Sequence, residues 1–126
     1  RQILATELWT THASLGSNPV MRGSWFASVS DGLYGQLAGK YRTRFGKAPY
    51  RLASLGYDSV LLTVRIARDW KPGTNFPANR LLAADGFGGI DGIFRFNDRG
   101  IAIRALEVSQ NGAGGFRVVD PAPTKW

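Results

Sequence analysis

The sequence contains no cysteine, one histidine and one methionine among its 126 residues. The absence of cysteine excludes disulfide bonds, thiol nucleophiles and cysteine-based zinc sites, and it is compatible with either the cytoplasm or the periplasm. A single histidine beside scattered carboxylates gives none of the ligand spacings that are typical of metal sites. We therefore expect neither a metal nor a cofactor.

Long apolar runs are also missing. No stretch approaches the roughly 20 apolar residues that are needed to span a bilayer. Residues 1–7 lack the three-part pattern of a signal peptide. The sequence does not start with methionine, and it enters an apolar run almost at once. We expect it to be a segment of a longer protein, with any targeting signal outside it.

Acidic side chains are few. Nine Asp and Glu oppose sixteen Lys and Arg, which gives a formal net charge of +7. Such an excess can suit an anionic partner, for example nucleic acid or a membrane surface. The densest basic group lies within residues 40–51, where a predicted helix ends and where the helix dipole favours cations. A solvated helix end is the better interpretation, and we expect no nucleic acid partner.

Apolar patterning predicts two strands and two helices in the first half of the chain. Short apolar runs predict strands at residues 3–9 and 23–29. The pair Ser30-Asp31 offers a capping residue for the first helix, which carries an apolar residue at every fourth position from Leu33 and stops at Gly46. The second helix extends from about residue 51 to 70. Its expected buried stripe consists of Leu52, Leu55, Val60, Leu61, Val64 and Ala67.

The last third of the sequence predicts an antiparallel meander. Three apolar runs at residues 93–96, 101–108 and 116–119 are separated by the turn signals of residues 97–100 and 111–115. Before the meander, a short helix is expected after Pro77, because proline suits a first turn. A small ribbon of this kind needs a helix or another sheet to cover its apolar face. The predicted fold class is α/β with an appended ribbon.

No constellation of catalytic residues is present in the sequence. His12 lies in a polar loop, and no G-x-S-x-G pattern supplies a nucleophile beside it. Residues 86–92 are rich in glycine, but they precede a predicted strand, whereas a phosphate-binding loop follows a strand and opens a helix. Turn glycines are the better interpretation. We therefore expect no enzymatic activity.

Glu7 is the candidate for a ligand contact. A carboxylate in an otherwise apolar strand is costly to bury unless it meets a cation or several donors, so it often points into a cleft. At the carboxyl end of a strand it would lie where open α/β sheets bind ligands. Exposure at a strand end is the alternative. Trp9 and Trp25 could line the same cleft, although large aromatic residues at strand ends more often pack in a core or at its rim.

Four segments, taken together, resemble the C-terminal third of type I periplasmic binding proteins. They are Ile3–Trp9, Leu37–Pro49, Ala53–Val60 and Phe87–Gly100. The nearest branch is the leucine/isoleucine/valine-binding-protein-like group, which includes bacterial proteins labelled penicillin-binding protein activators. The segments occur in that family's order and together cover nearly the whole chain.

The resemblance implies two α/β lobes that are joined by hinge strands and hold a small ligand between them. It assigns about residues 1–46 to the second lobe, residues 47–85 to helices of the first lobe, and residues 86–126 to a ribbon that returns to the second lobe. Glu7 falls where amino-acid binders of the family place a carboxylate facing the ligand's ammonium group. We predict Glu7 and Trp9 as ligand-binding residues, and most other contacts would come from upstream segments.

Two functions remain open after this resemblance. A periplasmic solute-binding receptor would close over a small polar, amino-acid-like ligand and present it to a membrane ABC transporter. A non-catalytic regulator would instead act by protein–protein contact with a cell-wall synthase. We also expect the chain to self-associate, because the partner of the apolar stripe on residues 51–70 would lie outside the chain.

Overall fold

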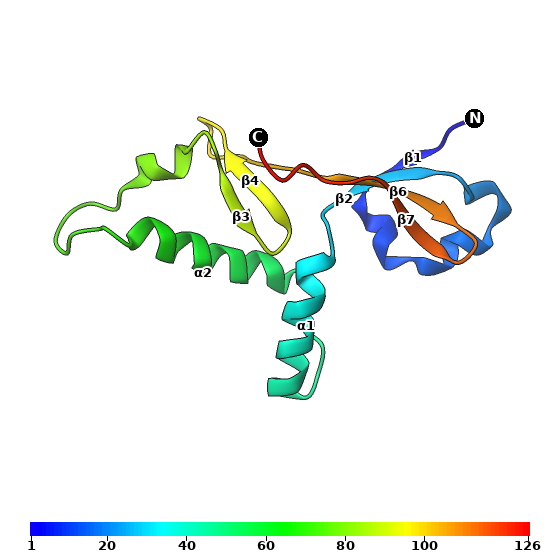
Figure 1. Ribbon diagram of the computed structural model, residues 1–126, viewed down its shortest axis with the longest axis horizontal. Coiled ribbons are helices and arrows are strands. Elements are labelled where there is room, and N and C mark those ends of the chain that lie inside the picture. Colours follow the sequence, from blue (N-terminus) through cyan, green and yellow to red (C-terminus); the bar gives the residue numbers. More distant parts are fainter. The chain divides into compact units, whose positions relative to one another are not determined.

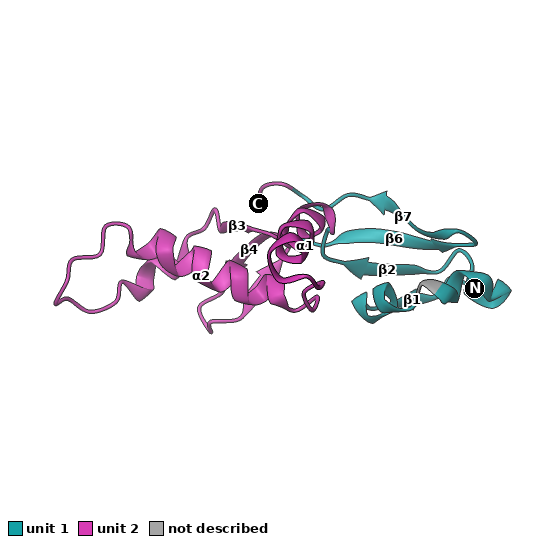
Figure 2. Ribbon diagram, turned by 90° about the horizontal axis from the view of Figure 1, so that it is seen from below, with its two compact units in different colours: residues 1–30, 105–123 teal, residues 31–104, 124–126 magenta. Residues whose placement is uncertain are grey.

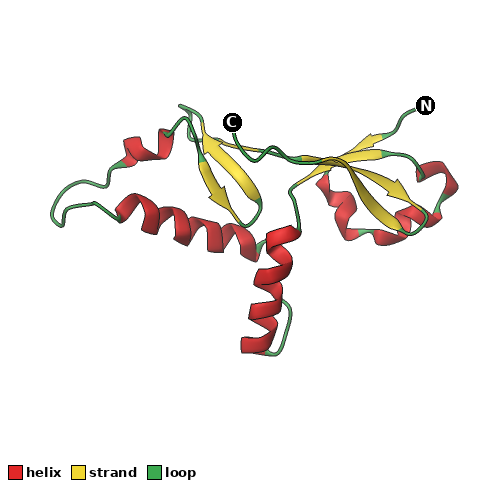
Figure 3. Ribbon diagram, in the orientation of Figure 1, coloured by secondary structure: helices red, strands yellow, loops and turns green.

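The computed structural model describes residues 1–12 and 14–126, which form two compact units (Figure 2). Unit 1 comprises residues 1–30 and 105–123, and unit 2 comprises residues 31–104 and 124–126. Helices and strands occur in both units (Figure 3), so the predicted α/β class is confirmed. The boundaries between the two units differ from the lobe boundaries that the resemblance implies. The assignment of residues to lobes stays a prediction.

Unit 1 is built on a four-stranded sheet with the order β1-β2-β6-β7 (Figure 1). Its strands are β1 (Leu4–Ala5), β2 (Trp25–Ser28), β6 (Glu107–Gly112) and β7 (Gly115–Asp120). The first pair is parallel and the other two pairs are antiparallel. Phe26 is the buried aromatic of this sheet, and its ring meets that of Phe116 edge-on with the centroids 4.8 Å apart. Such edge-to-face pairs stabilise a core beyond the area that they bury.

Three short 3-10 segments connect β1 to β2: η1 (Glu7–Thr11), η2 (Ala13–Ser17) and η3 (Pro19–Met21). The predicted strand at residues 3–9 is therefore wrong beyond Ala5. The hydroxyls of Thr10 and Thr11 donate to the carbonyls of Glu7 and Leu8 at 2.7 and 2.8 Å. Local bonds of this kind offer the backbone an alternative to a strand ladder. The strand predicted at residues 23–29 is confirmed as β2.

Unit 2 contains two α-helices, a 3-10 segment and a three-stranded antiparallel sheet with the order β3-β4-β5. These elements are α1 (Gly32–Phe45), α2 (Ala53–Ala67), η4 (Ala78–Leu82), β3 (Phe87–Gly89), β4 (Gly92–Phe96) and β5 (Ala102–Arg104). α1 ends at Gly46 as predicted, in the left-handed conformation with φ of 71°. Asp31 occupies the predicted cap position, but its side chain makes no cap bond and pairs with Arg51 instead.

α2 covers the three-stranded sheet through a face that the apolar pattern does not reveal. Ser54, Asp58 and Ile66 are its buried residues. Ile66 forms the core with Phe87 and Phe94, and the surrounding side chains are Leu62, Leu81 and Phe96. The stripe predicted to be buried is largely exposed, namely at Leu52, Leu55, Val60, Leu61 and Val64. This exposure agrees with the expectation that the partner of the stripe lies outside the chain, and polar side chains of α2 are instead bonded to the turn between β3 and β4.

The predicted meander is also wrong in one respect, because its middle run divides between the two units. β5 pairs with β4 in unit 2, whereas β6 pairs with β2 and β7 in unit 1. The first turn is confirmed: Asn97 Oδ1 accepts the N–H groups of Arg99 and Ile101 at 3.0 and 2.9 Å. Asparagine side chains stabilise tight turns in this way. The run from residue 101 to 108 therefore supplies two strands rather than one.

Gly89 gives a test of how closely α2 lies on the sheet. Asp58 Oδ1 accepts the Ile90 N–H at 2.7 Å, and a Cβ at Gly89 would lie 2.6 Å from Asp58 Cγ. We expect Gly89→Ala to lower the free energy of unfolding by about 2 kcal/mol, because the carboxylate must move from its bonded position. The measurement is urea unfolding followed by circular dichroism. Gly88→Ala is the matched control, since an added Cβ there meets nothing within 4 Å; equal losses in both variants would contradict the prediction.

Candidate functional site

Glu7 and Trp9 both lie in η1, which begins two residues after the end of β1. The side chain of Glu7 is exposed, and that of Trp9 is half-buried with its ring centroid 6.5 Å from that of Phe26. A cavity of about 230 Å³ lies beside β1 in the same unit. Its lining consists of Leu4, Ala5, Trp25, Phe26, Ala27 and Val108. Trp25 therefore lines this cavity and Glu7 does not; the ligand role of Glu7 and Trp9 stays a prediction.

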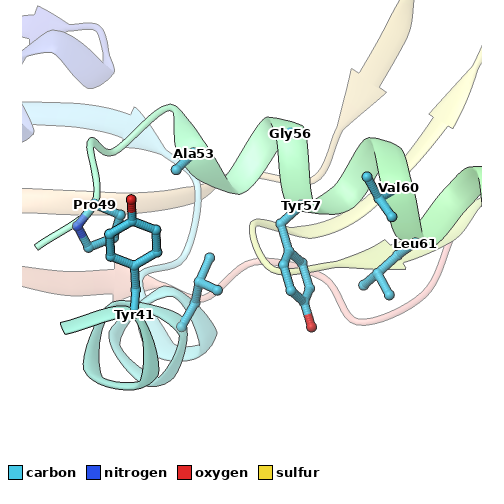
Figure 4. A pocket seen from close by; sticks show the side chains of 8 residues that line it. Tyr41, Pro49, Ala53, Gly56, Tyr57, Val60 and Leu61 are labelled. Carbon is cyan, nitrogen blue, oxygen red and sulfur yellow. The ribbon is translucent and has the colours of Figure 1, made fainter. Parts of the chain in front are cut away.

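A larger apolar cavity of about 380 Å³ lies between α1 and α2 of unit 2 (Figure 4). Its lining consists of Leu37, Tyr41, Pro49, Ala53, Gly56, Tyr57, Val60 and Leu61. None of these side chains carries a formal charge at neutral pH. An adjoining cavity of about 320 Å³ shares Leu37, Tyr41 and Tyr57 with the first and adds the cations Lys40 and Arg44. We call the first of these two cavities the α1–α2 groove.

The α1–α2 groove was missed in the sequence because its side chains were assigned to the protein core. The small residues Ala53 and Gly56 leave space on α2, and an added Cβ at Gly56 meets nothing within 4 Å. The side chains of Tyr57 and Val60 remain 43% and 64% exposed. One signal could have found the groove: α2 has apolar residues on opposite faces, which is typical of a helix between two layers.

Arg51 is the centre of an ionic cluster at the start of α2. Its Nη1 donates to Asp91 Oδ1 at 2.8 Å and to Ser54 Oγ at 2.9 Å, while its Nη2 donates to Asp31 Oδ1 at 3.0 Å. Ser54 Oγ donates to the other carboxylate oxygen of Asp91 at 2.7 Å. The guanidinium also lies 4.2 Å above the ring of Tyr34. The cluster thereby joins the first turns of both helices to the turn between β3 and β4.

Opposing effects act on the pKa of Arg51. Burial lowers it, but the hydrogen bond and charge of Asp91, together with those of Asp31, outweigh burial, so that the pKa lies above its ordinary value. The guanidinium is therefore charged throughout the pH range in which proteins are usually handled. Its donors are directed at protein carboxylates and a hydroxyl, which suits a structural role within unit 2.

Two further properties bear on the kind of site. In the described part of the chain, no three side chains from His, Cys, Asp and Glu are grouped so that they could hold a metal ion. Across residues 1–12 and 14–126, no helix has both the length and the apolar character of a membrane span. The candidate sites are the segment after β1 that carries Glu7 and the α1–α2 groove.

Two solved structures are similar to this chain over nearly its whole length. A protein from Rhodospirillum rubrum described as a candidate branched-chain amino acid ABC transporter matches 94% of the chain, with a TM-score of 0.71 and 22% identity. A leucine-binding protein from Thermotoga maritima matches 96%, with a TM-score of 0.52 and 20% identity. This chain spans 37% of the length of each of those chains.

No family model matches the chain, and no curated protein sequence matches it. The two structural likenesses nevertheless agree with the resemblance carried by the four sequence segments. The predicted fold, that of a C-terminal part of a type I periplasmic binding protein, is confirmed.

Proposed function

We propose that this chain, which has the fold of the C-terminal part of a type I periplasmic binding protein, belongs to a solute-binding receptor. The observation that carries the proposal is the likeness to the Rhodospirillum rubrum protein over 94% of the chain. The receptor holds a small, amino-acid-like ligand between two lobes and presents it to an ABC transporter. It acts in the periplasm, and it binds its ligand without chemical change.

Glu7 and Trp9 are the ligand contacts that this chain contributes. Glu7 is an exposed carboxylate directly after a strand, and Trp9 is held two residues further on by its packing against Phe26. An ammonium group that enters beside Glu7 gains a charge-assisted hydrogen bond, which is stronger than a neutral one. A ring fixed by packing can lie against the rest of the ligand with little loss of side-chain entropy. Together these groups favour a ligand with a cationic nitrogen next to an apolar body.

Thermal unfolding of the complete protein that contains this chain tests the proposal. The probes are leucine, glutamine and benzoate, each added in excess over the protein. A ligand that binds only the folded state raises the melting temperature, and we expect the largest rise with leucine. If none of the probes raises the melting temperature and the protein co-purifies with a cell-wall synthase, the regulator becomes the better explanation.

Glu7→Gln tests the residue assignment separately from the receptor role. We expect the affinity for leucine to fall at least about tenfold, because a neutral amide replaces the charged acceptor of the ammonium. Titration calorimetry measures the change. Asp98→Asn is the control, because it removes an exposed carboxylate from the turn that precedes β5. Equal affinity for leucine in the wild type and in Glu7→Gln would remove Glu7 from the site but leave the receptor role standing.

A further inference from the structure

Three aromatic rings from separate parts of the chain form a row in unit 1. Trp9 comes from η1, Phe26 from β2 and Phe116 from β7. The ring centroids of Trp9 and Phe26 lie 6.5 Å apart at an interplanar angle of 45°, and those of Phe26 and Phe116 lie 4.8 Å apart at 77°. Aromatic pairs attract each other at such separations. Both contacts are made within unit 1, so neither depends on segments outside the chain.

The contact between Phe26 and Phe116 crosses β6, which lies between β2 and β7 in the sheet. In the strand register Phe26 is opposite Ser109, and Phe116 is opposite Asn111. Residues that are directly opposite each other point to the same face of a sheet, as do residues two apart on one strand. All four side chains therefore share one face. Ser109 is 4% exposed and short, which allows the two rings to approach each other across β6.

The backbone and the side chain of Trp9 are fixed by different contacts. The Trp9 N–H donates to the carbonyl of Thr6 at 3.2 Å, and the Trp9 carbonyl accepts the N–H of His12 at 3.0 Å. These local bonds hold the backbone of η1, whereas the indole rests against Phe26. Phe26 is 2% exposed, so its orientation is set by its neighbours, and Phe116 makes the closer of its two ring contacts.

We propose that Phe116 is a positioning residue for Trp9. It fixes the ring of Phe26, and Phe26 in turn holds the indole of Trp9 in the orientation in which it meets the ligand. This inference rests on the proposed function, in which Trp9 is a ligand contact. A side chain that is already ordered loses less entropy when a ligand binds, so the row of rings raises the affinity. β7 thereby contributes to the binding site without touching the ligand.

Circular dichroism in the near ultraviolet tests the positioning in the complete protein without any ligand. The contribution of Trp9 is the difference between the spectra with and without Trp9→Phe, and it is strong only while the indole is held in fixed packing. We expect this difference to lose at least about half of its intensity in the Phe116→Leu background, because the edge-to-face pair with Phe26 is lost. Val118→Ala is the matched control on β7, since Val118 is 51% exposed.

Titration calorimetry with leucine separates positioning from a general loss of structure. We expect Phe116→Leu to lower the affinity about fivefold while Trp9 is present, which is within the range that an aromatic pair contributes. The same substitution should leave the affinity unchanged in Trp9→Ala, because its effect passes through the indole. Phe116→Tyr keeps the ring and should keep the wild-type affinity.

The outcomes distinguish this proposal from the proposed function. A Trp9 difference spectrum that is unchanged in Phe116→Leu would overturn the positioning role. An equal loss of leucine affinity from Phe116→Leu with and without Trp9 would also overturn it, because such a loss would be merely structural. If Trp9→Ala alone left the affinity unchanged, Trp9 would be no ligand contact, and the proposal would fail together with that assignment.

Discussion

Replacement of Arg51 by alanine is expected to lower the free energy of unfolding by about 3 kcal/mol, because it leaves the carboxylate of Asp91 buried without its cation. Asp91 is 3% exposed. Within residues 1–12 and 14–126, Ser54 Oγ, at 2.7 Å, would then remain as its side-chain donor. The side chain of Arg51 itself is 34% exposed, so the expected loss is at the lower end of the range for buried pairs. Urea unfolding followed by circular dichroism measures it.

The two carboxylates bound to Arg51 provide an internal comparison. The side chain of Asp31 is 68% exposed, so Asp31→Asn should cost no more than about 0.5 kcal/mol. Asp69→Asn is a control outside the cluster, because Asp69 is 77% exposed and lies 3.9 Å from Arg80. If Arg51→Ala lowered the free energy of unfolding no more than Asp31→Asn does, the ion pair between Arg51 and the buried Asp91 would contribute nothing to stability.

The protonation of Arg51 limits how this stabilisation can depend on pH. Folding raises the pKa of Arg51, so titration of the guanidinium itself removes none of its stabilisation at any pH below its ordinary pKa. That contribution is lost only as the pH rises through the raised value, in strongly alkaline solution. We therefore expect the difference between wild type and Arg51→Ala to be unaffected by arginine titration near neutral pH.

Local sequence signals predicted the boundaries of α1 and the first turn of the hairpin region. Gly46 ends α1 because it adopts a positive φ, and Asn97 forms its turn through bonds to residues close in sequence. Such features depend on a few neighbouring residues, so they can be read without knowing the tertiary structure. The fold as a whole was accessible only through the resemblance of four ordered segments, because each segment by itself is compatible with many folds.

Non-local bonds explain what the sequence could not predict. Ser54 and Asp58 are polar, yet they are buried because Asp91 and the Ile90 N–H meet them from the distant β3–β4 turn. Hydropathy alone therefore did not indicate which face of α2 lies against the sheet. The division of residues 101–108 between two sheets likewise depends on which distant strands are available as partners. For the candidate site, the sequence pattern placed Glu7 in or at the end of a strand, whereas it lies in η1, and the pattern did not indicate the α1–α2 groove.

The position of Gly16 leads to an equally large expected effect in unit 1. Gly16 is buried where η2 lies against the end of β6. A Cβ there would lie 3.0 Å from the carbonyl carbon of Gly112 and 3.2 Å from Asn111 Oδ1, and it would overlap Gly112 O. Two of these three atoms belong to the backbone of Gly112, which is paired with Gly115 of β7. They cannot move aside without disturbing the sheet.

We expect Gly16→Ala to lower the free energy of unfolding of unit 1 by about 3 kcal/mol, at the upper end of the usual cost of overpacking. Hydrogen exchange resolves the two units: amides of β2 and β6 should exchange faster, while those of α2 should keep their wild-type rates. Gly114→Ala is the control, because a Cβ there meets nothing within 4 Å. If β2 and β6 kept full protection in Gly16→Ala, η2 would not be packed on the sheet as described. Without that packing, η1, which carries Glu7 and Trp9, would also lack support. Gly16→Ala therefore tests the structure around the proposed ligand contacts as well as one packing contact.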